Sequence, residues 1–267
     1  MERAITNTRQ LTNTLIEESI FSHCTNSDHG AAILSKSLNS VISKCTGTFC
    51  ETESHHGQFF YQTTVERNEV YYTEIISCGN SNSYYSSVLY DGRLVNKYNN
   101  FSYNKCLRQC GHHMHLNTVN SSISMYLNII KNEAEGIINN FQTLFHLIKY
   151  TNTVQNTITK SNQCLVYLDA NSTALLISCV MKDNILNSGV FVACSNQSNS
   201  ITFDGCYIDS YEETERVTFN NLIDNVIKFN LIPDSLSYNK RFLDCQTYSV
   251  IYFQFHFSLF FVCIDLT

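Results

Sequence analysis

The sequence predicts an α+β fold, with antiparallel sheets and amphipathic helices packed on one face. Apolar residues recur near a 3.6-residue period in several stretches, which indicates helices. Runs rich in β-branched and aromatic residues, separated by turn-forming residues, indicate strands elsewhere. With 267 residues, of which 43% are hydrophobic, the chain is long enough for one large domain or two modest ones.

The region 1–105 is predicted to be α+β. One helix is expected from residue 1 to about 23 and a second around 31–42, because apolar residues fall on one side of each. These residues are Leu11, Leu15, Ile16 and Ile20, then Ala31, Ile33, Leu34, Leu38, Val41 and Ile42. Strands are expected at 58–65, 69–76 and 84–95, with hairpin turns at Arg67-Asn68 and Asp91-Gly92.

A Cys/His-rich connection is predicted at 106–123, followed by a domain of helix and antiparallel meander over 124–267. The long helix is predicted from one apolar face: Ile130, Ala134, Ile137, Ile138, Phe141, Leu144, Phe145 and Ile148. The meander strands are expected at 164–169, 174–181, 189–194 and 201–208, separated by turn-forming residues. A second helix over 222–229 is expected to end at Pro233.

The most hydrophobic stretch is 249–264. It is shorter than the roughly 20 apolar residues of a bilayer span, and it contains Gln254 and His256. Alternating apolar residues favour core strands. A tail anchor and a truncated, non-native end are the alternatives.

The charge balance argues against nucleic acid as the main ligand. The net charge is −6, and no block of one sign forms a basic stripe of the kind that phosphate binding needs. Other proteins are the expected partners, and a membrane is not expected.

The expected state of the twelve cysteines depends on the cellular compartment, because disulfides form in oxidising compartments and thiols stay free in reducing ones. The first residues lack an apolar stretch long enough for a signal peptide, so an intracellular location, nuclear or cytoplasmic, with free thiols is expected. The alternative is an exported, disulfide-rich glycoprotein, for which sequons stand at Asn100, Asn120, Asn171 and Asn196.

The densest cluster of metal-ligand side chains lies in the predicted connection. Thiolates and imidazoles are the preferred zinc ligands, and a structural site needs four. The candidates are Cys45, Cys50, Cys106, Cys110, His112 and His115. The spacing of Cys110, His112 and His115 resembles part of a RING finger, which implies a zinc-stabilised or ubiquitin-ligase-like module. The alternative is a solvated histidine loop with buried thiols and no cofactor.

No catalytic motif points to a reaction. Ser22-His23-Cys24 and Asp28-His29 place nucleophile, base and acid side by side, but adjacent residues are expected to point apart. His55-His56 is interpreted as a loop pair, and Asp169 and Asp204 as turn residues. GxSxG, GxGxxG, P-loop and HExxH motifs are absent, so an enzyme is not favoured and no catalytic residue is assigned.

The order of elements predicted over 141–264 resembles one domain of the DNA sliding clamps, especially the checkpoint clamp subunits. The resemblance rests on a helix at Phe141 to Thr159, a meander from Cys164 to Ile208, and a short strand at Val217 leading into a second helix. It implies a non-catalytic platform in DNA repair or checkpoint signalling that forms a ring with homologous subunits. The helices depart from that family in offering few basic residues, namely Lys149 and Lys228.

The sequence therefore predicts a non-catalytic macromolecular interaction or scaffold protein, with the clamp-like platform as its most specific version. The zinc-stabilised module and the exported glycoprotein are the alternatives.

Overall fold

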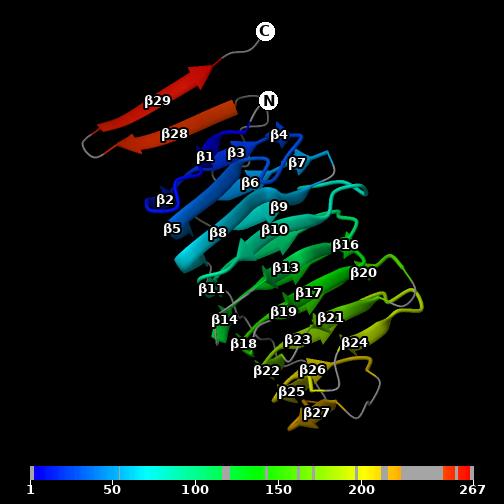
Figure 1. The fold of residues 1–267 in the computed structure, drawn as a ribbon. Coiled ribbons are helices and arrows are strands. Elements are labelled where there is room, and N and C mark those ends of the chain that lie inside the picture. The colour runs from blue at the N-terminus through cyan, green and yellow to red at the C-terminus, as the bar shows by residue number, and fades with distance from the viewer. Residues whose placement is uncertain are drawn as a thin grey trace.

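The chain folds as a parallel β-solenoid in which each coil stacks on the one before it (Figure 1). The computed structural model describes residues 3–53, 55–115, 121–141, 144–160, 163–169, 172–195, 198–211, 216–223, 249–255 and 258–264. No helix occurs within these ranges. The predicted α+β class is therefore wrong, because the chain buries its apolar residues between stacked coils.

The largest sheet has 15 strands, and it forms two rows because the long strands β5 and β8 contribute to both. The first row holds β1 (Ile5–Asn7), β5 (Ile33–Ser43), β8 (His56–Tyr71), β10 (Tyr85–Tyr90), β13 (Gln109–His115), β17 (Gly136–Phe141), β21 (Cys164–Leu168) and β24 (Val190–Cys194). The second row adds β2 (Asn13–Glu17), β11 (Arg93–Lys97), β14 (Ser121–Met125), β18 (Phe145–Lys149), β22 (Thr173–Ile177), β25 (Ser200–Asp204) and β27 (Val217–Asn220).

A parallel sheet of eight strands forms the other long side of the solenoid. Its strands are β3 (Ile20–Ser22), β6 (Thr46–Thr48), β9 (Glu74–Ile76), β12 (Asn100–Ser102), β15 (Asn128–Ile130), β19 (Asn152–Val154), β23 (Val180–Lys182) and β26 (Tyr207–Ile208). Two short parallel pairs complete the coils: β4 (Thr25–Asn26) with β7 (Glu51–Thr52), and β16 (Glu133–Ala134) with β20 (Thr157–Ile158).

Two corners recur in the coils, and each is made by one residue with positive φ. The first corner links the second row to the eight-stranded sheet, and the second corner follows that sheet. The first-corner residues are Glu18, Lys44, Tyr72, Tyr98, Tyr126, Tyr150, Ser178, Gly205 and Asn221. The second-corner residues are His23, Phe49, Ser77, Tyr103, Lys131, Gln155 and Asp183. Non-glycine residues rarely adopt this conformation, so contacts between neighbouring coils must stabilise it.

Stacked asparagines stabilise the second corner in the central coils. The residue after that corner is Asn104, Asn132, Asn156 or Asn184 in successive coils. The Asn132 Nδ2 donates to Asn156 Oδ1 at 3.0 Å, and Asn132 Oδ1 accepts from the Asn104 backbone N–H at 3.0 Å. This asparagine ladder pairs backbone groups that would otherwise be buried without partners.

Stacked tyrosines line the first corner in the same coils. The ring of Tyr98 lies 4.8 Å from the rings of both Tyr72 and Tyr126, with interplanar angles of 2° and 3°. Tyr126 and Tyr150 continue the stack at 5.0 Å. The tyrosine ladder uses the ring faces for contacts between coils, so that it presents ring edges to solvent.

The core runs along the inside of the solenoid and is made of apolar residues that point inward from the parallel strands. Its largest fully buried side chains are Phe59, Phe60, Phe101, Phe203, Ile33, Ile42, Ile75, Leu89, Leu94 and Leu127. Phe21 and Phe59, from neighbouring coils, lie 5.6 Å apart at their ring centroids, so aromatic packing joins the N-terminal coils.

The helix predicted across 130–148 is replaced by strands β15, β16, β17 and β18. Ile137, Ile138 and Ile148 are buried as predicted, but Leu144 is 55% exposed. Short strands joined by corners place apolar residues at intervals that imitate a helical period. The helices predicted near the N-terminus fail for the same reason: Leu11 is 90% exposed, and 33–43 forms β5.

The predicted meander contains strands, but they are parallel and pair between coils. Leu175 of β22 pairs with Leu147 of the preceding coil and Thr202 of the following one. The expected hairpin turns are likewise wrong, since Arg67 lies inside β8 and the strands on either side of Asp91 do not pair with each other.

The last strands, β28 (Ser249–Phe255) and β29 (Ser258–Ile264), pair antiparallel with each other. The expectation of strands in 249–264 agrees with this backbone, and their side chains lie outside the described part. The second helix expected at 222–229 and Pro233 fall largely outside the described residues. Within those residues, no helix is long and apolar enough to span a membrane.

Candidate functional site on the N-terminal coils

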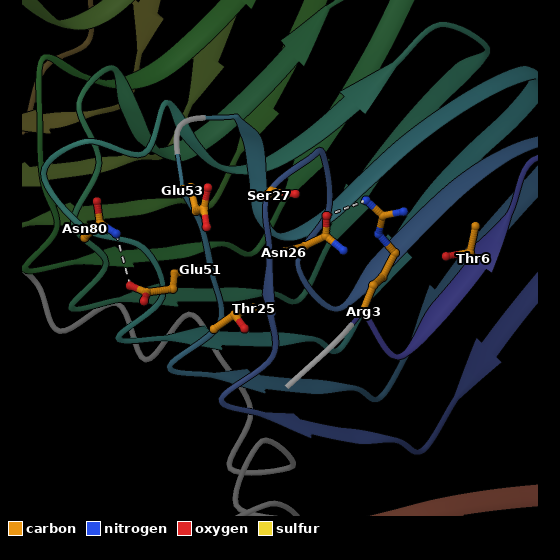
Figure 2. A pocket seen from close by; sticks show the side chains of 8 residues that line it. All are labelled: Arg3, Thr6, Thr25, Asn26, Ser27, Glu51, Glu53 and Asn80. Atoms are coloured by element: carbon orange, nitrogen blue, oxygen red, sulfur yellow. Dashed lines mark hydrogen bonds between the residues drawn. The ribbon is translucent and has the colours of Figure 1, made fainter.

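A polar hollow of about 950 Å³ opens on the N-terminal coils (Figure 2). Every residue that lines it has a hydroxyl, amide, carboxylate or guanidinium group. The lining residues are Arg3, Thr6, Thr25, Asn26, Ser27, Glu51, Glu53 and Asn80. Because β4 and β7 pair in parallel, Thr25 lies opposite Glu51, and side chains of successive coils share one surface.

Arg3 fixes one wall of the hollow. Its guanidinium donates to the carbonyl oxygen of His29 at 2.5 Å, to that of Gly30 at 2.9 Å and to Asn26 Oδ1 at 3.2 Å. On the other side, Asn80 Nδ2 donates to Glu51 Oε2 at 3.0 Å. Figure 2 shows the Arg3–Asn26 and Asn80–Glu51 contacts as dashed lines. These bonds hold the loops in place before any ligand arrives.

Three polar side chains of the lining keep their hydrogen-bonding capacity. Within the described part of the chain, the side chains of Thr6, Ser27 and Glu53 form no hydrogen bond or ion pair. Hydroxyls both donate and accept, and the carboxylate accepts. The hollow therefore offers free donors and acceptors beside fixed ones.

An imidazole cluster, formed by Asp28, His29, His55 and His56, lies next to the hollow. His29 Nδ1 is 2.5 Å from Asp28 Oδ1. The ring of His29 stacks on those of His55 and His56 at centroid distances of 5.2 Å and 5.1 Å. Asp28, His29 and His55 each place a potential ligand atom within 4.8 Å of the other two.

Equivalent glycines of two coils bring these side chains together. The sequences Ser-Asp-His-Gly at 27–30 and Ser-His-His-Gly at 54–57 are similar, and the Ala31 N–H after the first donates to the carbonyl oxygen of Gly57 at 3.1 Å. Gly30 has φ of +65°, and its N–H donates to the carbonyl oxygen of His56 at 2.9 Å. A Cβ at Gly30 would lie 2.1 Å from the Ile33 carbonyl oxygen, so only glycine fits the turn.

The cluster sets the charge of its members. The hydrogen bond from His29 and the nearby Arg3 lower the pKa of Asp28 from 3.8 to about 2, so it is ionised at neutral pH. Burial and the neighbouring His29, His55 and Arg108 lower the pKa of His56 to about 4, so this imidazole is neutral.

Aromatic side chains extend the cluster along the first row of the large sheet. His56 stacks on Tyr85 at 4.6 Å and on Tyr84 at 5.5 Å. The guanidinium of Arg108 lies 5.7 Å from the centre of the Tyr84 ring. These contacts, made by residues later in the chain, hold the His56 ring in place.

The structure places the predicted zinc ligands Cys45 and Cys50 after two different corners. Cys45 Sγ contacts the Ser43 carbonyl oxygen at 3.3 Å, and Cys50 Sγ contacts that of Thr48 at 3.4 Å. Burial raises the pKa of Cys45 to about 12. Both thiols thus occupy the post-corner positions that threonine or asparagine fills in other coils.

The other predicted ligands lie nearer one another in the chain. The buried thiols of Cys106 and Cys110 share a hydrogen bond, and burial raises the pKa of Cys110. The backbone of His112 and His115 belongs to β13, and their side chains lie outside the described part. Zinc binding by Cys45, Cys50, Cys106, Cys110, His112 and His115 stays a prediction. The ten cysteines whose side chains the structure describes are free.

The adjacent residues that resemble catalytic pairs do contact each other. Ser22 Oγ lies 2.8 Å from His23 Nδ1, and Thr48 Oγ1 donates to Ser22 Oγ at 3.0 Å. His23 stacks on Phe49 at 5.0 Å. Among the described residues no carboxylate bonds to His23, so the pair lacks the group that would orient the base.

Sequence reasoning missed the hollow and the cluster because it missed the coil repeat. The repeated Ser-x-His-Gly at 27–30 and 54–57 was the available signal, since equivalent positions of a solenoid lie side by side.

No family model, curated protein or solved structure matches the chain.

Proposed function

We propose that the chain is a non-catalytic binding protein whose rigid solenoid presents the polar hollow to a hydroxyl-rich ligand, such as a short saccharide. The observation that carries the proposal is the lining of polar residues, in which fixed groups lie beside the free side chains of Thr6, Ser27 and Glu53. A saccharide hydroxyl both donates and accepts, so it can pair with these donors and acceptors, which an apolar ligand would leave unpaired.

The clamp-like version of the scaffold hypothesis is not carried forward. It depended on a helix at 141–159 and an antiparallel meander, whereas parallel strands occupy the described residues there. Solenoids commonly bind partners on surfaces built from several repeats, and the hollow spans the N-terminal coils through Arg3, Asn26, Glu51 and Asn80.

The test is binding of the full chain to an array of defined oligosaccharides, repeated with the variants Glu53→Gln and Asn26→Ala. We expect binding to one saccharide class and at least a tenfold loss of affinity in each variant. Glu66→Gln, an exposed carboxylate of β8 away from the hollow, is the matched control. Absence of binding across the array, or equal affinity in all variants, would contradict the proposal.

A further inference from the structure

Three side chains of the imidazole cluster meet the chemical needs of a transition-metal ion. Asp28 and His29 come from one coil and His55 from the next, and their ligand atoms lie within 4.8 Å of one another. Zinc is commonly bound by histidine nitrogens and a carboxylate oxygen, often with three protein ligands and one open position. We propose that Asp28, His29 and His55 form a zinc-type metal site that joins the first two coils of the solenoid.

The required adjustment is small and can fall on the exposed side chain of Asp28. In a tetrahedral site with bonds of about 2 Å, ligand atoms lie roughly 3.3 Å apart. Asp28 Oδ1 and His29 Nδ1 are already 2.5 Å apart, and the Asp28 side chain is 60% exposed. Side-chain rotation at the surface can therefore close the site without moving the core.

Hydrogen bonds already fix the backbone around the site. Arg3 donates to the carbonyl oxygens of His29 and Gly30, and the Gly30 N–H donates to the His56 carbonyl oxygen. His56 positions the site, because its ring stacks on His29 with an interplanar angle of 8°. Such preorganisation reduces the entropy lost when the ligands are fixed.

Arg3 is the main feature that opposes a cation at this place. Its Nη2 lies 3.8 Å from Asp28 Oδ2, whereas the other oxygen, Oδ1, faces His29. The two cations would use different oxygens of one carboxylate. Two imidazoles with one carboxylate favour zinc, copper or nickel over magnesium or calcium, which prefer oxygen ligands.

The metal site goes beyond the proposed saccharide binding and rests on other residues. Its failure would leave the hollow and its ligand untouched, since Asp28, His29 and His55 do not line the hollow. Likewise, failure of saccharide binding would leave the metal site intact, because metal binding needs none of Thr6, Ser27 and Glu53.

The experiment titrates the full, reduced chain with Zn²⁺ by calorimetry and with Co²⁺ by visible absorption. We expect one high-affinity ion per chain and a Co²⁺ spectrum without thiolate charge-transfer bands. His29→Gln, His55→Gln and Asp28→Asn should each lower affinity at least tenfold. His23→Gln, which changes a histidine at another corner, should bind as the wild type does.

Circular dichroism of each variant checks that the fold is kept, and a thermal melt supplies a second readout. Zinc should raise the Tm of the wild type and of His23→Gln by several degrees, and should leave that of His55→Gln unchanged. The proposal is overturned if no stoichiometric ion binds, if thiolate bands appear, or if the cluster variants bind as tightly as the control.

Discussion

The N-terminal and central coils share one backbone path but stabilise its second corner with different chemistry. After that corner the N-terminal coils carry Cys24, Cys50 and Cys78, and the central coils carry the asparagine ladder. The Cys50 thiol contacts carbonyl oxygens at 3.4 and 3.8 Å. Asn132, in contrast, donates to the Phe101 carbonyl oxygen at 2.9 Å and continues the ladder on both sides.

The difference shows that the corner demands a buried small side chain but not one particular hydrogen-bonding pattern. Thiols are weak donors, so the N-terminal coils depend more on apolar packing, such as that between Phe21 and Phe59. The amide ladder adds several strong hydrogen bonds per coil. We therefore expect the central coils to be the more stable part of the solenoid.

The largest expected effect is at the ladder itself. Asn132→Ala removes the side-chain bonds of Asn132 to Asn104, to Asn156 Oδ1 and to the Phe101 carbonyl oxygen. The backbone N–H of residue 132 still donates to Asn156 Oδ1. At about 1 kcal/mol per bond, with buried groups left unpaired, the free energy of unfolding should fall by about 3–5 kcal/mol. Cys50→Ala, at the equivalent position, should lower it by about 1–2 kcal/mol.

Urea denaturation of both variants measures this difference. Equal losses in the two variants would mean that the amide ladder adds nothing beyond burial, and would remove the proposed contrast between the coils.

A smaller effect is expected at the first corner. Tyr98→Ala loses two ring stacks, each of about 0.5–1.5 kcal/mol, so the free energy of unfolding should fall by about 1–3 kcal/mol. Lys44→Ala is the matched control, since Lys44 also has positive φ and its ion pair with Glu18 is exposed. Its loss should stay within about 1 kcal/mol. If the denaturation curves of Tyr98→Ala and Lys44→Ala coincide, ring stacking is not stabilising.

Thiol reactivity tests the difference in burial between individual cysteines. Burial raises the pKa of both Cys45 and Cys164 to about 12, so neither forms appreciable thiolate at pH 8. Cys194 is half-buried and should react before both of them. A short iodoacetamide pulse on the folded chain, followed by peptide mass spectrometry, measures the order. Modification of Cys45 before Cys194 would show that the N-terminal coils open readily at neutral pH.

The smallest effect is the acid response of the imidazole cluster. The pKa of Asp28 is lowered from 3.8 to about 2, so its stabilising contribution is complete above pH 4 and is lost as the pH falls through 2. Asp28→Asn should melt below the wild type at pH 5 and together with it near pH 2. Melting curves that differ equally at both pH values would show that the Asp28 charge is not involved.

Strand-forming segments could be predicted from the sequence, but their arrangement could not. The expected strand at 58–65 lies in β8, and the one expected at 201–208 is divided between β25 and β26 by the corner at Gly205. β-Branched and aromatic residues favour extended backbone in both. In the asparagine ladder, pairing between coils joins residues 24 to 28 positions apart, and local periodicity carries no information at that distance. The sequence feature that indicates this pairing between coils is the repeat of Asn104, Asn132, Asn156 and Asn184.

The candidate site was visible only in fragments for the same reason. Asp28-His29 and His55-His56 stand out in the sequence as separate pairs, and only coil stacking brings them together. Arg3 and Asn80 carry no motif, because their role in the hollow follows from neighbouring coils and not from neighbouring residues.

The most direct test of the contrast between the two regions is hydrogen exchange of the full chain, measured by mass spectrometry under native conditions. The central strands β12, β15 and β19 should exchange through openings that cost more free energy than those of β3 and β6, the equivalent N-terminal strands. Slower exchange in the central strands by at least tenfold is the predicted result. Equal exchange along the eight-stranded sheet, or slower exchange in β3 and β6, would contradict the account.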